Sequence, residues 1–160
     1  MAPERADPEH DQRHALGTVM SDEFAPSQSR RKARILIVED EAMIAFTLEE
    51  LLVMSGFDSA GVAGRLDVAL DIIERDVCDA AILDANLAGT SSAPAALALT
   101  KRGVPFIVVS GYSAAQQPDP AFSGAPRLQK PCDIDDLISA LHGILPDYAG
   151  LESHGPASRR

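Results

Sequence analysis

The stretch "RILIVEDEA", residues 34–42, decides how the rest of this 160-residue sequence is interpreted. Its apolar run Ile35–Val38 contains β-branched residues and favours a short buried strand. Three consecutive carboxylates, Glu39, Asp40 and Glu41, follow at once. A carboxylate leaves water at a high cost unless it is paired or meets a cation. The stretch is therefore either a solvated turn after a strand or a site that binds something positive.

The composition narrows the class of protein. Apolar residues make up 46% of the chain and aromatic residues only 4%, so the core must be built from Ala, Val, Ile and Leu. No apolar run approaches the roughly 18 residues of a membrane span, and the N-terminus lacks the apolar segment of a signal peptide. A formal net charge of −10 argues against nucleic-acid binding. The two cysteines have no metal-ligand spacing, so we expect a reduced, cytoplasmic protein.

Short apolar strands alternate with helical segments after the opening stretch. Further strands are predicted at 57–64, 79–84, 104–112 and 127–131, and helices at 41–56, 65–77, 92–103 and 133–145. In the first helix we expect Ile44, Leu48, Leu51 and Leu52 to face inward, and Asp133 is expected to cap the last helix. Residues 113–126 hold three prolines within nine positions, so a turn or two at most is expected there, near Ala114 and Gln116.

This alternation predicts an α/β fold with a doubly wound parallel sheet of order 2-1-3-4-5 and a fourth helix that is short or missing. The topology opens a crevice outside the carboxyl ends of strands 1 and 3. We expect the domain to span residues 34–146, between a flexible N-terminal arm, 1–33, and a flexible C-terminal tail, 147–160. Only 14 residues follow Pro146 in this sequence, so we do not expect an output domain there.

Polar residues stand at the ends of four predicted strands. Glu39 and Asp40 end the first strand, Asp84 the third, Ser110 the fourth and Lys130 the fifth. The topology places all of them at one edge, and such convergence of polar groups marks a site. Mg²⁺, a hard cation that prefers oxygen ligands, resolves the conflict among three carboxylates. The cation and the lysine together suit a phosphoryl group, whose transfer depends on positioning and charge neutralisation.

Four motifs in this order carry a family resemblance over residues 33–146. "ILIVEDE", "AILDANLAG", "VVSGY" and "LQKP" resemble the acidic-pair, phosphoacceptor, hydroxyl and Lys-Pro motifs of the flavodoxin-like receiver domain of two-component response regulators. The resemblance implies that Asp84 is the nucleophile that attacks a phosphohistidine. It implies that Asp40, Asp84 and the backbone carbonyl of Asn86 ligate Mg²⁺, with Glu39 acting through metal-bound water.

The same resemblance implies further roles and partners. Lys130 would pair with the phosphoryl oxygens, Ser110 would hydrogen-bond them, and the Lys130–Pro131 peptide bond would be cis, an isomer that X-Pro bonds tolerate. The expected partners are a sensor histidine kinase or a histidine phosphotransfer protein and an unknown downstream protein. Such a domain catalyses only its own phosphorylation and dephosphorylation, so it is a switch rather than an enzyme in the ordinary sense.

Within the family, "PFIVVSGY" and the proline-broken segment after it resemble the alphaproteobacterial FAT GUY subgroup of stand-alone regulators, which suggests a general stress pathway. Val108–Ser110 stands where that subgroup has Phe-Ala-Thr. In many receivers an aromatic residue three positions before the lysine swings inward on phosphorylation, but here that position is Arg127. Output is therefore expected through the loop from Tyr112 to Phe122, with Tyr112 and Arg127 on the output surface.

Two alternatives from other classes stay open. An Asp-nucleophile phosphatase of the haloacid-dehalogenase type wants a second Asp two residues after the nucleophile, but that position is Asn86, and there is little room for a cap domain. A degenerate receiver acting as a constitutive binding module is the other alternative. The complete set of acidic, hydroxyl and lysine residues speaks against it.

Overall fold

The computed structural model describes residues 31–116, 118–145 and 148, and it contains the parallel sheet that the sequence predicts. The strands are β1 (Arg34–Val38), β2 (Asp58–Ala63), β3 (Ala80–Asp84), β6 (Phe106–Ser110) and β7 (Arg127–Gln129). They pair in the order β2-β1-β3-β6-β7, and every pair is parallel. This is the predicted 2-1-3-4-5 order. The expected arm and tail lie outside the described residues, apart from residues 31–33 and 148.

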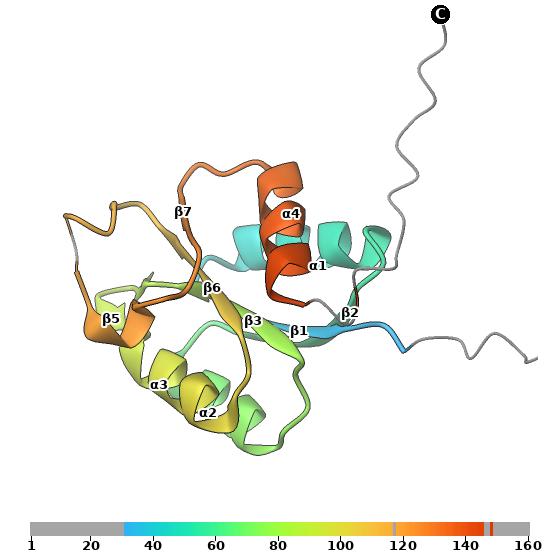
Figure 1. The fold of residues 1–160 in the computed structure, drawn as a ribbon, viewed down its shortest axis with the longest axis horizontal. Helices are drawn as coiled ribbons and strands as arrows, with labels where there is room; N and C mark the ends of the chain where they lie inside the picture. The colour runs from blue at the N-terminus through green and yellow to red at the C-terminus, as the bar shows by residue number, and fades with distance from the viewer. Residues whose placement is uncertain (1–30, 117, 146–147, 149–160) are drawn as a thin grey trace, which may run out of the picture. The chain divides into compact units, whose positions relative to one another are not determined.

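Helices cover both faces of the sheet. Helices α1 (Ala42–Met54) and α4 (Ile134–Ile144) lie on one face, and α2 (Leu66–Glu74) and α3 (Ala93–Arg102) lie on the other (Figure 1). Side chains of a strand alternate between faces, so Ile35 and Ile37 pack with α1 and α4, whereas Leu36 and Val38 pack with α2 and α3. Because both faces are covered, the four residues of β1 after Arg34 are all apolar, rather than only alternate ones.

The described residues of the connection between β6 and β7, 111–116 and 118–126, contain no α-helix, as the prolines predict. A turn at residues 113–116 is followed by a short 3₁₀ helix, η1 (Pro120–Phe122). The carboxylate of Asp119 caps η1 by accepting a hydrogen bond from the backbone N–H of Ala121 at 2.9 Å. Phe122 is 8% exposed and packs into the core cluster on the α3 side. One aromatic ring thus supplies apolar cover where the doubly wound fold usually has a helix.

Several local predictions were wrong. Ile44 was expected to face inward but is 39% exposed, while Ala45 and Leu52 are the buried residues of α1. Asp133 stands at the N-cap position of α4 but makes no side-chain hydrogen bond to the helix.

None of the helices among the described residues is long and apolar enough to cross a membrane.

A small hairpin between β3 and α3 was not predicted. Strands β4 (Asn86–Leu87) and β5 (Thr90–Ser91) pair antiparallel. The turn between them has positive φ at both central residues, 48° at Ala88 and 91° at Gly89. Glycine adopts such a backbone freely, whereas alanine does so at a cost. The hairpin begins two residues after Asp84, so it is next to the candidate site along the chain.

A carboxylate at the opposite edge of the sheet joins distant parts of the chain. The Asp79 carboxylate accepts hydrogen bonds from the Arg31 guanidinium at 2.7 and 3.0 Å and from the backbone N–H of Arg34 at 2.7 Å. Arg31 also donates to the hydroxyl of Tyr148 at 3.1 Å. Burial raises the pKa of Asp79, but the hydrogen bonds from Arg31 and Arg34 outweigh it and lower the pKa from 3.8 to about 2. Tyr148, expected at the start of a frayed tail, is half-buried.

Asp79→Asn should lower the free energy of unfolding by about 2 kcal/mol at pH 7, because hydrogen bonds to a charged group are lost. A carboxylate with a lowered pKa in the folded state stabilises the fold above its unfolded pKa, and this contribution disappears as the pH falls through the folded pKa. The difference between wild type and variant should therefore shrink as the pH falls from 3.8 to about 2 and vanish below that. Urea unfolding at a series of pH values measures it.

Asp71→Asn is the matched control, because Asp71 pairs with Arg75 on the exposed surface of α2, where an ion pair contributes little. A penalty for Asp79→Asn that stayed the same from pH 7 down to pH 3 would contradict the assigned role.

Candidate functional site

The carboxyl ends of the strands bring the predicted polar residues to one edge. Glu39 directly follows β1, Asp84 is the last residue of β3, and Ser110 is the last residue of β6. The backbone N–H of Lys130, just after β7, donates to the carbonyl of Ser110 at 2.9 Å. The peptide bond between Lys130 and Pro131 is cis, as expected. Parallel pairing of these strands thus gathers residues that are far apart in the sequence.

One ammonium group bridges two buried carboxylates at this edge. The Lys130 Nζ donates to Glu39 Oε2 at 2.8 Å and to Asp84 Oδ2 at 2.7 Å. Glu39 is 5% exposed and Asp84 9%. Burial lowers the pKa of Lys130, but the hydrogen bonds to Asp84 and Glu39 outweigh it, so the pKa lies well above its ordinary value of 10.5. Lys130 is therefore a fixed positive charge between the two carboxylates at neutral pH.

The acidic cluster has the donor set of a magnesium site. Carboxylate oxygens of Glu39, Asp40 and Asp84 all lie within 4.8 Å of one another. In their ionised forms they carry three negative charges against the one positive charge of Lys130. The second oxygens of Glu39 and Asp84 accept backbone N–H groups, of Glu41 and Asn86 respectively, each at 3.0 Å, which orients both side chains. Hard oxygen ligands with excess negative charge fit Mg²⁺.

The side chains of Asn86 and Ser110, both predicted site residues, accept hydrogen bonds from backbone N–H groups two or three residues further along the chain. The Asn86 side-chain oxygen accepts a hydrogen bond from the N–H of Gly89 at 2.6 Å, within the β4–β5 hairpin. Ser110 is 2% exposed, and its hydroxyl oxygen accepts a hydrogen bond from the backbone N–H of Tyr112 at 3.1 Å. The Tyr112 side chain is 57% exposed. The hydroxyl of Ser110 is therefore tied to the loop that carries Tyr112.

The predicted output residue Arg127 contacts an aromatic ring from another segment. Its guanidinium carbon lies 5.5 Å from the centroid of the Phe122 ring, within the range of a cation–π interaction. The role of Phe122 in such a contact was not foreseen. The signal available in the sequence was that Phe122 is the only aromatic residue of the proline-rich segment 113–126.

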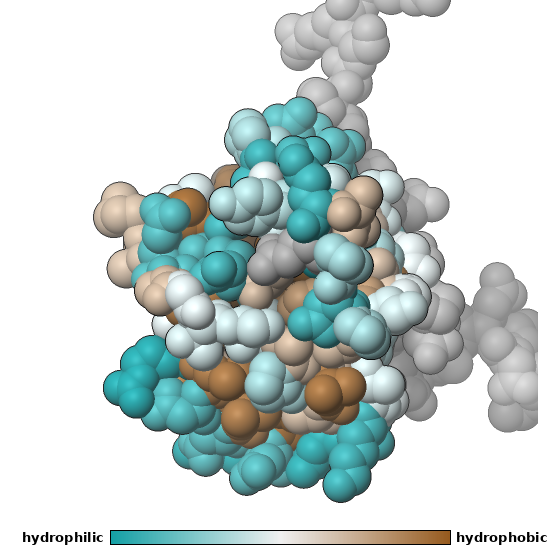
Figure 2. Space-filling model, turned by 90° about the vertical axis from the view of Figure 1, so that its left-hand side faces the viewer, coloured by the Kyte–Doolittle hydropathy of each residue, from teal (hydrophilic) through white to brown (hydrophobic). Residues whose placement is uncertain are grey.

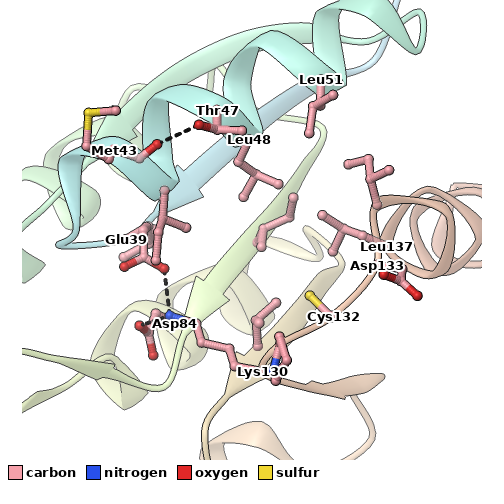
Figure 3. A pocket seen from close by; sticks show the side chains of 16 residues that line it. Glu39, Met43, Thr47, Leu48, Leu51, Asp84, Lys130, Cys132, Asp133 and Leu137 are labelled. Atoms are coloured by element: carbon pink, nitrogen blue, oxygen red, sulfur yellow. Dashed lines mark hydrogen bonds and ion pairs between the residues drawn. The ribbon is translucent and has the colours of Figure 1, made fainter.

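An apolar cleft of about 650 Å³ opens between α1 and α4 next to the acidic cluster. Glu39, Asp84 and Lys130 lie at one end of it, with α1 along one side and α4 along the other (Figure 3). Its apolar lining includes Met43, Ile44, Leu48, Leu51, Ile134 and Leu137. The sequence did not predict this cleft, because helical spacing puts Ile44, Leu48 and Leu51 on one face of α1 without showing what that face meets.

The comparisons with known proteins agree with this geometry. The model of the response regulator receiver domain matches residues 35–142. The transcriptional regulatory protein PdtaR of Mycobacterium tuberculosis is 32% identical over 111 residues, which cover 68% of this chain and 54% of that protein. This chain therefore spans about half the length of the curated relatives that it matches.

Two solved structures are similar in fold and in sequence. SdrG from Sphingomonas melonis is 40% identical, with a TM-score of 0.62, over 71% of this chain and 97% of that one. The receiver domain of PhyR from Erythrobacter litoralis is 26% identical, with a TM-score of 0.62, over 72% of this chain and 91% of that one. The family match spans more than half of the sequence, including every strand-end residue of the candidate site. The chain belongs to the response regulator receiver domain family.

Proposed function

We propose that this chain is a stand-alone cytoplasmic phosphorylation switch of a two-component system. It accepts a phosphoryl group from a histidine kinase or a histidine phosphotransfer protein onto Asp84, and it signals through contacts with a downstream protein. The observation that carries the proposal is the pairing of Asp84 with Lys130 inside an acidic cluster at the carboxyl edge of the sheet. The 40% identity to SdrG over 97% of that chain supports the receiver part of this proposal.

In this proposal Asp84 is the nucleophile. A carboxylate oxygen of Asp84 attacks phosphorus, an O–P bond forms as the P–N bond of the phosphohistidine breaks, and the imidazole nitrogen keeps the electron pair. Lys130 already touches Asp84, so its ammonium can pair with the phosphoryl oxygens as negative charge gathers there. The hydroxyl of Ser110, whose oxygen accepts the N–H of Tyr112, would donate its proton in a hydrogen bond to a phosphoryl oxygen.

The carboxylates of the acidic cluster, which repel one another, would hold the metal. Asp40, Asp84 and the backbone carbonyl of Asn86 are the proposed direct ligands, and Glu39 would act through metal-bound water. Mg²⁺ would neutralise charge on the transferring group and orient it for in-line attack. The hydrogen bond from Glu41 to Glu39 and the one from Asn86 to Asp84 fix the carboxylates before any metal arrives.

The cleft between α1 and α4 supports a helical phosphodonor as the partner. Its lining is mostly apolar and it reaches Asp84, so a helix docked there brings a side chain to the nucleophile. Exposed carboxylates flank both sides, Glu41 at the start of α1 and Asp133, Asp135 and Asp136 at the start of α4. A donor helix with an apolar stripe and flanking Lys or Arg side chains complements this surface.

The match to the receiver family rules against the haloacid-dehalogenase alternative, which needs a second Asp where this chain has Asn86.

Phosphorylation by acetyl phosphate tests the degenerate-receiver alternative. If the proposal is correct, acetyl phosphate with Mg²⁺ should add one phosphoryl group to the protein, and chelating the Mg²⁺ with EDTA should abolish this. Intact-mass spectrometry measures the adduct, and restoring Mg²⁺ after EDTA is the control. Equal phosphorylation with and without the metal would contradict the magnesium site, and no phosphorylation under either condition would favour a constitutive binding module.

A further inference from the structure

The cleft between α1 and α4 has the size of a small-molecule site. Its volume of about 650 Å³ falls in the range of roughly 300 to 1,000 Å³ in which proteins bind small ligands. Leu48 and Leu51 of α1 point toward Leu137 of α4 across it (Figure 3). Its floor consists of sheet residues, Ile82 of β3 and Val109 of β6, which are 2% and 7% exposed. A helix lying across α1 and α4 would reach this floor only with side chains, so the depth of the cleft is left for a smaller apolar group.

The cleft ends at carboxylates that can accept further hydrogen bonds. Glu39 and Asp84 each accept one bond from Lys130 and one from a backbone N–H. An ionised carboxylate has about four acceptor sites, so each of the two has capacity left. Among the described residues that line the cleft, the carboxylates of Glu39, Asp84 and Asp133 stand against the ammonium of Lys130 alone. A ligand with a positive head is therefore attracted to this end, whereas an anionic ligand is repelled.

The mouth of the cleft lies on a face that solutes can reach. In Figure 1, β1 starts near residue 31 and runs to the opposite side of the molecule, where α1 begins, and Figure 2 faces that side. Hydrophobic surface is exposed there between hydrophilic residues. At the start of α1, Met43 and Ile44, which both line the cleft, are 77% and 39% exposed. An amphipathic molecule can therefore enter from solvent without any movement of the sheet.

We propose that this cleft binds small amphipathic cations, with a compact apolar body between α1 and α4 and an ammonium or amidinium head at Glu39 and Asp84. The same two carboxylates belong to the acidic cluster that would hold Mg²⁺. Two cations on the same oxygens repel each other, so the ligand and Mg²⁺ each weaken the binding of the other by the same factor. Through this competition the ligand slows the phosphorylation of Asp84. That last effect rests on the proposed function, whereas the binding does not.

Three naphthalene probes of similar shape test the proposal: naphthylmethylamine, naphthylmethanol and naphthoic acid. NMR titration of the full chain without Mg²⁺, followed on the methyl groups of Leu48, Leu51 and Leu137, measures each affinity. The amine should bind about tenfold more tightly than the alcohol, the factor that one hydrogen bond to a charged group supplies. The acid should bind more weakly than the alcohol. Saturating Mg²⁺ should weaken binding of the amine by about fivefold or more and leave the alcohol unchanged.

Variants of the cleft locate the binding. Leu51→Phe places a larger side chain in the cleft and should weaken the amine and the alcohol alike, by about tenfold. Val53→Phe is the matched control, because Val53 is 47% exposed and does not line the cleft, and it should weaken neither probe. Asp84→Asn removes one carboxylate and should weaken the amine alone. Thermal unfolding shows that each variant is folded.

The outcomes separate this inference from the proposed function. Equal affinity for the amine and the acid, or an affinity for the amine that Leu51→Phe leaves unchanged, would overturn the binding site and leave the function intact. Phosphorylation by phosphoramidate at a subsaturating Mg²⁺ concentration measures the competition, and a rate that bound amine did not slow would overturn it. If phosphoramidate does not phosphorylate the protein even without the amine, the proposed function fails and the binding site stands.

Discussion

Asp84→Asn should abolish phosphorylation by acetyl phosphate and Mg²⁺, leaving no phosphoryl adduct in the intact-mass spectrum. The amide has nearly the size of the carboxylate, and its oxygen can still accept the N–H of Asn86. Lys130 loses the carboxylate at position 84 as a partner but keeps Glu39. An amide oxygen is a poor nucleophile and a weaker ligand for a hard cation than a carboxylate. The loss should therefore be one of chemistry rather than of folding.

The matched control is Asp58→Asn. Asp58 begins β2, its side chain is 51% exposed, and it is paired with Lys32 at 3.9 Å. This variant should be phosphorylated like the wild type, and both variants should unfold near the wild-type temperature. If Asp84→Asn carried as much phosphoryl adduct as the wild type, another residue would be the acceptor, and peptide mapping would then locate it.

The sequence predicted the features that depend on strand ends. A parallel strand that is buried on both faces reads as a run of apolar residues, and the first polar residue after it falls at the carboxyl edge. This rule places Glu39, Asp84 and Ser110 at one edge, where the structure has them. Lys130 follows β7, whose sequence Arg-Leu-Gln is not an apolar run, so its place depended on the expected strand order. The gap in the helix pattern was equally predictable, because three prolines remove backbone donors from residues 113–126.

Features that depend on the packing of distant elements were not predictable from local patterns. Helical spacing groups Ile44 with Leu48 and Leu51, but it does not say how close α4 comes to α1, so the open cleft between them was missed. The contact of Arg127 with Phe122 depends on where the loop before β7 returns to the sheet. The hydrogen bond from Lys130 to both carboxylates likewise needed coordinates, since the charges alone allow several pairings.

Lys130→Met should show that Lys130 has two effects: it neutralises the carboxylates in the free protein, and it stabilises charge on the transferring phosphoryl group. Without the ammonium, Glu39 and Asp84 each lose a hydrogen-bond partner and have no counter-ion, and at low Mg²⁺ the free energy of unfolding should fall by about 1 to 3 kcal/mol. Mg²⁺ should bind more tightly than to the wild type, because no ammonium competes for the oxygens, and it should restore the lost stability. Phosphoryl uptake should nevertheless fall by about 100-fold or more, because one fixed charge on the transferring group is gone.

Thermal unfolding with and without Mg²⁺, calorimetric titration of Mg²⁺ and the rate of phosphorylation by acetyl phosphate measure the three effects. Lys101→Met is the matched control, since Lys101 is an exposed lysine in the last turn of α3. It should leave all three quantities near their wild-type values. In Lys130→Met the affinity for Mg²⁺ should rise while phosphoryl uptake falls. A variant that was merely misfolded would lose both. Weaker Mg²⁺ binding in Lys130→Met would therefore mean that Lys130 supports the metal site instead of competing with it.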